Sequence, residues 1–309
     1  MKLRSQETKT KVYILMKYQI FIYFLVLLYS SSYSQSFIID GTPKIAYWEY
    51  GNAEPTIIII NGGPGIDHTY LRPEWDTLSS ISRIIYYDQR GCGESDNSIN
   101  YSWIEHLKDL KRLKDQLSPG KKIVLAASSW GTNIALLFSL YFPNDTKGLI
   151  LSGFPDWRGI NFKKVDLYMY QIDSVMNFKR TLPISDEIIS IAKSKIAIEQ
   201  DSFAKASKSK SVVPSFNKIL KWKSKEAHQQ TFNSQPSMPE LTFFTEIHVP
   251  TLILTGDLYC GYSDWSDILA KKIAGSVLFI IENSCHDPWY SNPTVFFAKC
   301  FEFIKKFNQ

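Results

Sequence analysis

The segment IVLAASSWG, residues 123–131, decides the fold. A continuous apolar run ends directly in small residues, and the largely apolar stretch from Asn133 to Phe142 follows with a helical pattern. Continuous apolar runs of this length are typical of parallel strands that are covered on both faces. A buried strand that leads straight into a helix is one unit of an alternating β and α chain. The segment therefore predicts an α/β architecture.

Further strand and helix patterns alternate on both sides of this segment. The stretch from Trp103 to Leu117 carries leucines at helical spacing, and a second helical pattern runs from Asn292 to Phe307. This order predicts a mostly parallel, doubly wound sheet. The predicted strands are Ile38-Ile39, Ile45 to Tyr50, Thr56 to Ile60, Arg83 to Tyr87, Ile123 to Ala126, Leu149 to Ser152, Thr251 to Thr255 and Val277 to Ile281.

The alternation stops between about Pro155 and His248. That stretch contains many lysines, no convincing strand, and helical fragments such as the one from Asp186 to Ile198. We interpret it as a helical cap inserted after the sixth strand. The predicted organisation is a first core part over residues 35–155, a cap over 156–247 and a second core part over 248–309.

Composition and charge narrow the class of protein. Of the 309 residues, 44% are hydrophobic and 21% are charged, which excludes a disordered chain. The net charge of +5 is concentrated in residues 1–34, which hold five basic residues and one acid. The remainder has 30 basic and 29 acidic residues, a net charge of +1. A nearly neutral mature chain argues against nucleic acid as a partner.

The N-terminus has the pattern of a secretory signal peptide. Lys17 precedes the apolar run from Ile20 to Tyr29, and Ser32-Tyr33-Ser34 supplies small residues for cleavage. Ten apolar residues are too few to cross a bilayer, which takes about 20. We expect residues 1–34 to be removed, leaving a secreted or periplasmic protein with no stable membrane span. An uncleaved anchor that also uses residues 12–16 is the alternative.

Three segments contain candidate catalytic residues, and the first is the turn at Ser129 between the strand and the helix of residues 123–142. A serine between a strand and a helix is exposed above the sheet, and the N–H of Trp130 would face a developing oxyanion. The segment NGGPG, residues 61–65, follows a strand and leaves backbone N–H groups approachable, although alone it would be a plain turn. His286, in CHDPW at residues 285–289, follows the last strand. A triad histidine is expected there when the triad residues follow one another along the chain as serine, acid and histidine.

These motifs together carry a resemblance. NGGPG (61–65), DQRGCGES (88–95), SSWG (128–131) and CHDPW (285–289) resemble the proline iminopeptidase family of α/β-hydrolases. The chain is also similar to the tricorn-interacting aminopeptidases. The resemblance spans the core from about Asn61 to Phe301 but not the cap.

The resemblance implies an α/β-hydrolase fold and a serine hydrolase acting on a small peptide. It implies that Ser129 and His286 are catalytic and that Gly63 and Trp130 donate to the oxyanion. It also gives Cys92, a member of one motif, a structural role. No metal or organic cofactor is needed for such acyl transfer.

Two positions depart from the family pattern. In the family the triad acid lies three residues after the glycine that ends the seventh strand; here that glycine is Gly256 and the position is Tyr259. Tyrosine is not an anion near neutral pH. The next position, a glutamate that binds the substrate amine in the tricorn-type enzymes, is Cys260. A carboxylesterase and a degenerate, non-catalytic hydrolase therefore remain alternatives to an aminopeptidase.

The triad acid has three candidates. We predict Asp257, because it lies on the loop that carries the acid in the resembling enzymes. Asp156 follows the sixth strand, whose end also faces the histidine. Asp264 lies further along the Asp257 loop and is expected to start a helix as its N-cap.

The remaining cysteines and histidines have less specific readings. Cys260 and Cys285 lie on loops that must converge, so an oxidising compartment would permit a disulfide, with two free thiols as the alternative. Cys300 lies on an apolar helical stripe and is expected in the core. His106 and His228 lie in lysine-rich helical surroundings and are expected to be solvated, whereas His68 could line the pocket.

Overall fold

The computed structural model describes residues 36–38, 41–153, 224–234, 241–257, 264–284 and 286–308. All of them belong to one compact unit, residues 36–309. The predicted signal peptide, most of the predicted cap, Asp156, Tyr259, Cys260 and Cys285 lie outside the described residues.

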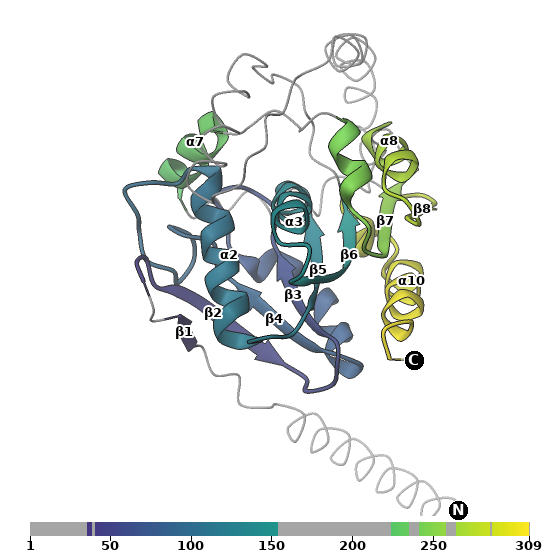
Figure 1. Ribbon diagram of the computed structural model, residues 1–309, viewed down its shortest axis with the longest axis horizontal. Coiled ribbons are helices and arrows are strands. Elements are labelled where there is room, and N and C mark those ends of the chain that lie inside the picture. Colours follow the sequence, from purple (N-terminus) through teal and green to yellow (C-terminus); the bar gives the residue numbers. More distant parts are fainter. Residues whose placement is uncertain are drawn as a thin grey trace, which may run out of the picture. The chain divides into compact units, whose positions relative to one another are not determined.

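An eight-stranded sheet forms the centre of this unit, with the order β1-β2-β4-β3-β5-β6-β7-β8 (Figure 1). β1 and β2 pair in antiparallel fashion, as do β2 and β4, and the pairs from β4 through β8 are all parallel. The predicted mostly parallel α/β sheet is thus confirmed. The strands are β1 Ser36–Ile38, β2 Ile45–Tyr50, β3 Thr56–Ile60, β4 Arg83–Tyr87, β5 Ile123–Ser128, β6 Thr146–Ser152, β7 Thr251–Gly256 and β8 Val277–Ile281.

Helices cover both faces of the sheet. They are η1 His68–Leu71, η2 Glu74–Ser80, α2 Trp103–Leu117, α3 Trp130–Tyr141, α7 Lys225–Ser234, η4 Leu241–Glu246, α8 Asp264–Lys272, α9 Pro288–Ser291 and α10 Pro293–Lys305. The strands β3, β5 and β7 are buried along their whole length. Since successive side chains of a strand point to opposite faces, each of these strands feeds two cores.

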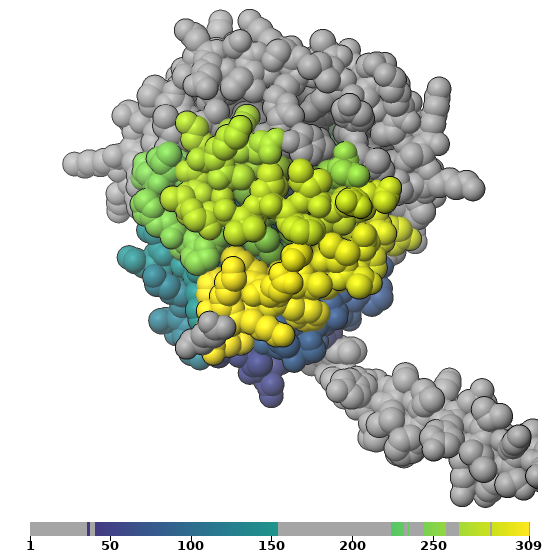
Figure 2. Space-filling model, turned by 90° about the vertical axis from the view of Figure 1, so that its right-hand side faces the viewer, coloured from purple at the N-terminus to yellow at the C-terminus, as the bar shows by residue number. Residues whose placement is uncertain are grey.

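The two cores are separate clusters of apolar side chains. Ile58 and Ile60 of β3 pack with side chains of α2 and α3. Ile57 and Ile59 pack on the other face with η2 and α10. Figure 2 shows the side of the molecule on which α8 and α10 lie, at the β8 end of the sheet. There the edge strand β8 is less buried, with Val277 47% and Ile280 44% exposed.

The carboxyl ends of the parallel strands meet at one edge of the sheet. Asn61 follows β3, Ser129 follows β5, Gly153 follows β6 and Asp257 follows β7. Binding sites in open α/β sheets form at this edge. No helix among the described residues has the length and apolar content that a membrane crossing needs.

Candidate functional site

Ser129 lies at a sharp turn between β5 and α3. Its backbone has φ 51° and ψ −125°, a conformation that is strained for a residue with a side chain. Its N–H donates to the carbonyl oxygen of Ser152 at 2.9 Å, which ties the turn to β6. At Gly131, a Cβ atom would lie 2.4 Å from the carbonyl oxygen of Ile60. Only glycine lets α3 start this close to β3, so packing imposes the turn that presents Ser129.

His286 meets Ser129 at this edge. The imidazole Nε2 lies 3.0 Å from the Ser129 Oγ, within hydrogen-bond distance. The histidine segment packs closely against the end of β6. A Cβ atom on Gly153 would lie only 2.4 Å from the His286 carbonyl oxygen. The structure thus brings together two residues that are 157 positions apart.

Asp257 contacts the same segment through the backbone. Its N–H donates to the Ile281 carbonyl at 3.1 Å, and its Oδ1 accepts from the Ser284 N–H at 3.0 Å. Within the described part of the chain, no hydrogen bond joins the Asp257 carboxylate to the His286 imidazole. Asp257 therefore anchors the backbone two residues before His286. Of the alternatives, Asp264 is the first residue of α8, and Asp156 lies outside the described residues.

The glycine segment passes directly beside the serine. A Cβ atom on Gly62 would lie 3.0 Å from the Ser129 Cβ, and Gly63 has φ 125°, a value that favours glycine. Trp130 is the first residue of α3, and the N–H groups of a first helical turn have no partner within the helix. Gly63 and Trp130 therefore both have backbone N–H groups in the vicinity of Ser129.

Two motif side chains for which the sequence analysis gave no role, Asn61 and Gln89, hold this segment in place. Asn61 Nδ2 donates to the carbonyl oxygens of Gly62 and Ile66, both at 2.9 Å. Gln89 Nε2 donates to the Asn61 carbonyl at 2.9 Å and Gln89 Oε1 accepts from Trp130 Nε1 at 3.0 Å. The DQRG motif thereby links the glycine segment to the start of α3.

Tyr70 forms a second link. Its hydroxyl accepts from the Gly62 N–H at 2.6 Å and donates to the Ser128 Oγ at 3.0 Å. Burial is the main cause that raises the Tyr70 pKa above its ordinary value, and the nearby Asp287 carboxylate adds to it. The phenol therefore stays protonated and can donate throughout the physiological range.

Helix α7, from the predicted cap, rests on the glycine segment. The Ser224 N–H donates to the Gly65 carbonyl at 3.1 Å, and His228 Nδ1 lies 2.9 Å from the Pro64 carbonyl oxygen. His228 is half-buried, so the expectation that it is solvated is wrong. The lysine-rich context gave no sign that this side chain contacts the glycine segment.

His68 and His106 are both buried. His68 is paired with Asp88, with Nδ1 2.8 Å from Oδ1, and lies against the Trp48 ring. His106 is 2% exposed, so its predicted solvation is wrong. Burial, and second the charge of Arg90, lower the His106 pKa from 6.5 to about 3. It lies on the apolar face of α2, where its Nε2 contacts the Thr231 hydroxyl of α7 at 3.1 Å.

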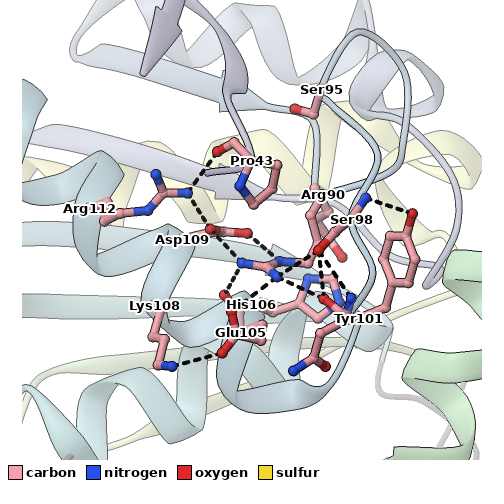
Figure 3. A network of polar contacts seen from close by, with 12 residues as sticks. Pro43, Arg90, Ser95, Ser98, Tyr101, Glu105, His106, Lys108, Asp109 and Arg112 are labelled. Carbon is pink, nitrogen blue, oxygen red and sulfur yellow. Dashed lines mark hydrogen bonds and ion pairs between the residues drawn. The ribbon is translucent and has the colours of Figure 1, made fainter. Parts of the chain in front are cut away.

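Arg90 of the DQRG motif anchors the loop after β4 (Figure 3). Its guanidinium binds both carboxylate oxygens of Asp109, at 2.7 and 2.9 Å, and donates to the Asn100 carbonyl at 2.7 Å. Arg90 and Asp109 are both almost fully buried. A buried and bidentate pair of this kind fixes the loop, and with it the neighbouring Gln89.

Neither of the two described cysteines has the features of a reactive thiol. Cys92 and Cys300 are free and buried. Burial raises the Cys92 pKa to about 12, the opposite of what a thiolate nucleophile needs. Cys300 packs in the core, as predicted. In the described ranges no cluster of histidine, cysteine and acidic side chains could hold a metal ion.

The profile of the alpha/beta hydrolase fold family matches residues 55–293. Curated proline iminopeptidases are similar to the chain over shorter regions. The one from Saccharolobus solfataricus is 36% identical over 99 residues, which cover 31% of this chain and 32% of the relative. The one from Lactobacillus helveticus is 34% identical over 129 residues, 37% of this chain and 43% of the relative. The chain thus matches about a third to two fifths of the length of these relatives.

Solved structures are similar over most of the chain. The proline iminopeptidase of Mycobacterium smegmatis superimposes with a TM-score of 0.64 and 15% identity, covering 88% of this chain and 98% of the other. A thermophilic esterase from Thermogutta terrifontis gives a TM-score of 0.63 and 20% identity, covering 89% and 99%. At these identities the likeness shows the fold alone.

Proposed function

Because the chain belongs to the alpha/beta hydrolase fold family, we propose that it is a serine hydrolase that releases N-terminal residues from peptides by acyl transfer. The observation that carries this proposal is the contact of 3.0 Å between Ser129 Oγ and His286 Nε2. It occurs at a strained turn that the glycine segment passes closely, the arrangement that activates a serine in this fold.

The chemistry would run in two halves. His286 takes the proton of the Ser129 hydroxyl while Oγ attacks the substrate carbonyl, and the N–H groups of Gly63 and Trp130 stabilise the resulting oxyanion. The intermediate then collapses to an acyl-enzyme as His286 gives its proton to the leaving amine. Water, deprotonated by His286, hydrolyses the acyl-enzyme and restores Ser129. Every step uses side-chain and backbone groups of this chain.

We assign Asp257 as the acid that supports His286. Its support is its position after β7 and its hydrogen bond to the Ser284 N–H, two residues before the histidine. A carboxylate there stabilises the imidazolium that forms during the reaction. Asp156, after β6, remains the alternative, since Gly153 at the end of that strand packs against His286.

A carboxylesterase is the second candidate function. In the resembling aminopeptidases the acid and an amine-binding glutamate occupy the positions of Tyr259 and Cys260. Loss of the glutamate favours a substrate without a free N-terminal amine. The same two positions underlie the third candidate, a degenerate hydrolase that binds without turnover.

Labelling with a fluorophosphonate separates an enzyme from a degenerate relative, because only an activated serine reacts. We expect wild-type protein to be labelled on Ser129 and the Ser129→Ala variant to stay unlabelled. The neighbouring Ser128 is fully buried and should not react. We therefore expect peptide mapping to find the label on Ser129 alone. An unlabelled wild-type protein would refute the proposed activity. Aminoacyl anilides tested against short-chain nitrophenyl esters then decide between peptidase and esterase.

We also propose that the chain is exported and acts on small peptides or esters outside the cytoplasm. The support is the basic and apolar N-terminal sequence. Mass spectrometry of protein from the native host would give the mature N-terminus. We expect it at Gln35, and an intact residue 1 on the protein would contradict cleavage.

A further inference from the structure

Two side chains fix the peptide units on either side of Gly62. Asn61 Nδ2 donates to the Gly62 carbonyl oxygen at 2.9 Å, and the Tyr70 hydroxyl accepts from the Gly62 N–H at 2.6 Å. Asn61 and Tyr70 are both buried, at 0% and 9% exposed. Neither side chain is part of the serine and histidine pair.

The contact from Asn61 determines where the Gly63 N–H points. The Gly62 carbonyl and the Gly63 N–H belong to one planar peptide unit, in which they point in opposite directions when the peptide is trans. The Gly62–Gly63 peptide is trans. Holding the carbonyl oxygen on Asn61 therefore directs the N–H of Gly63 to the opposite side. Glycines on both sides of this peptide would otherwise leave it free to rotate.

Tyr70 holds the preceding peptide and links it to the nucleophile turn. Its hydroxyl donates its proton to the Ser128 Oγ at 3.0 Å. The same hydroxyl oxygen accepts from the Gly62 N–H. Ser128 immediately precedes Ser129, so one phenol spans the glycine segment and the serine turn. A Cβ atom on Gly62 would lie 2.6 Å from the Tyr70 oxygen, so glycine is required for this contact.

We propose that Asn61 and Tyr70 are positioning residues that hold the Gly63 N–H in its oxyanion-binding direction before substrate arrives. The inference rests on the proposed serine hydrolase function. Donors that are fixed in advance stabilise the transition state without reorganisation, and loss of one donor costs about 10²–10³ in kcat. Loosening a donor, in contrast to removing it, costs less.

The test compares isosteric variants. Tyr70→Phe removes one hydroxyl, and Asn61→Asp replaces the donor to the Gly62 carbonyl by a repelling oxygen. Tyr87→Phe is the matched control, because Tyr87 is 1% exposed and its hydroxyl has no hydrogen-bond partner among the described residues. The readouts are kcat and KM for the best anilide or ester, and the Kd of a trifluoromethyl ketone analogue, which forms an oxyanion adduct with the serine.

We expect Tyr70→Phe to lower kcat about 10-fold, less than the loss of a donor, and Asn61→Asp about 100-fold, at the lower end of the range for a lost donor. KM should change less than about twofold, and the Kd of the ketone should rise by the same factor as kcat falls. Tyr87→Phe should match the wild-type protein in all three. A role in folding alone would not link the ketone affinity to kcat.

Wild-type values of kcat and ketone Kd in both Tyr70→Phe and Asn61→Asp would overturn the inference, as would an equal loss in Tyr87→Phe. If one variant fails to fold, the other and Ser128→Ala, which removes the acceptor of the Tyr70 proton, decide the matter. A wild-type protein inert to fluorophosphonate rejects the proposed function and this inference together. A labelled wild-type protein with unaffected variants rejects the inference alone.

Discussion

The two halves of the candidate site, at one edge of one sheet, are held in different ways. The serine half is fixed by side chains from the loop after β4, from η1 and from α3, with Gln89 and Tyr70 each joining two segments. On the acid half, the Asp257 carboxylate accepts from the Ser284 N–H, and the other contacts of Asp257 and of Gly153 with this segment involve backbone atoms. In the first half, buried side chains fix the position of the Ser129 turn and of the glycine segment. In the second, the Asp257 carboxylate holds the histidine loop, and it is also the group that we propose as the acid supporting His286.

The largest effect is expected from removing either of the two side chains that join the halves, Ser129 and His286. Ser129→Ala and His286→Ala should each lower kcat by about 10⁶, as removal of a triad serine or histidine does. Both side chains are only half-buried, and the turn is maintained by backbone contacts such as the one to Ser152. Thermal melting should therefore change little. Either variant with wild-type turnover would show that the contact of 3.0 Å is not catalytic.

The second prediction tests the acid half. Asp257→Asn keeps an oxygen that can accept from the Ser284 N–H, so the loop should stay in place while the charge is lost. We expect kcat to fall by up to about 10⁴ with little change in stability. Asp257→Ala, which also removes the acceptor, should lower the melting temperature as well.

The matched variant is Asp156→Asn, on the neighbouring strand end. It should retain most of the wild-type kcat. Full activity in Asp257→Asn together with an inactive Asp156→Asn would place the acid after β6. The Asp257 contact to Ser284 would then be structural, and the two halves of the site would differ even more than their contacts indicate.

The sequence predicted the sheet well because buried parallel strands carry their own signal. β2, β3, β4 and β8 have the predicted bounds. β5 extends to Ser128 and β6 starts at Thr146, both beyond the predicted runs, because polar residues can pair within a strand that is buried by its neighbours. The turn at Ser129 was also visible, since it joins two such signals.

The contacts of the supporting side chains were not predictable, because no motif or strand ending indicates which partner each of them meets. Tyr70 meets Ser128 across 58 positions, and Gln89 meets Trp130 across 41. His106 was assigned to solvent from its lysine neighbours. Its spacing from Trp103 and Leu110, three and four residues away, places it on the buried stripe of α2 and could have corrected that assignment.

The third prediction concerns a disulfide that would stabilise the acid half. A disulfide between Cys260 and Cys285 would join the loop after β7 to the segment before His286, and an exported protein would meet conditions that allow it. Such a bond typically contributes about 2–4 kcal/mol to the free energy of unfolding. Mass spectrometry of non-reduced peptides from exported protein should recover the two cysteines as one linked pair. Recovery of both as free thiols would refute the bond.

The smallest effect concerns the support of the serine half. His106, whose ring lies edge-on to Trp130 at 5.8 Å between centroids, is neutral in the folded protein because its pKa is lowered from 6.5 to about 3. Below pH 6.5 the unfolded chain binds a proton at His106 that the folded chain does not. This contribution to stability is fully present above pH 6.5 and is lost as the pH falls toward 3.

The wild-type free energy of unfolding should therefore fall, relative to His106→Gln, by about 1.4 kcal/mol per pH unit below pH 6. Denaturant unfolding of both proteins at pH 7, 6 and 5 measures this difference, and all other titrating groups cancel in it. His248→Gln is the control, because His248 is exposed and its loss should leave the pH dependence unchanged. Parallel curves for the wild-type protein and His106→Gln would mean that His106 binds its proton as readily in the folded protein as in the unfolded chain, and is charged there at pH 5. The contact of its Nε2 with the Thr231 hydroxyl would then be part of a charged site beneath Trp130, and the packing of the serine half would itself depend on pH.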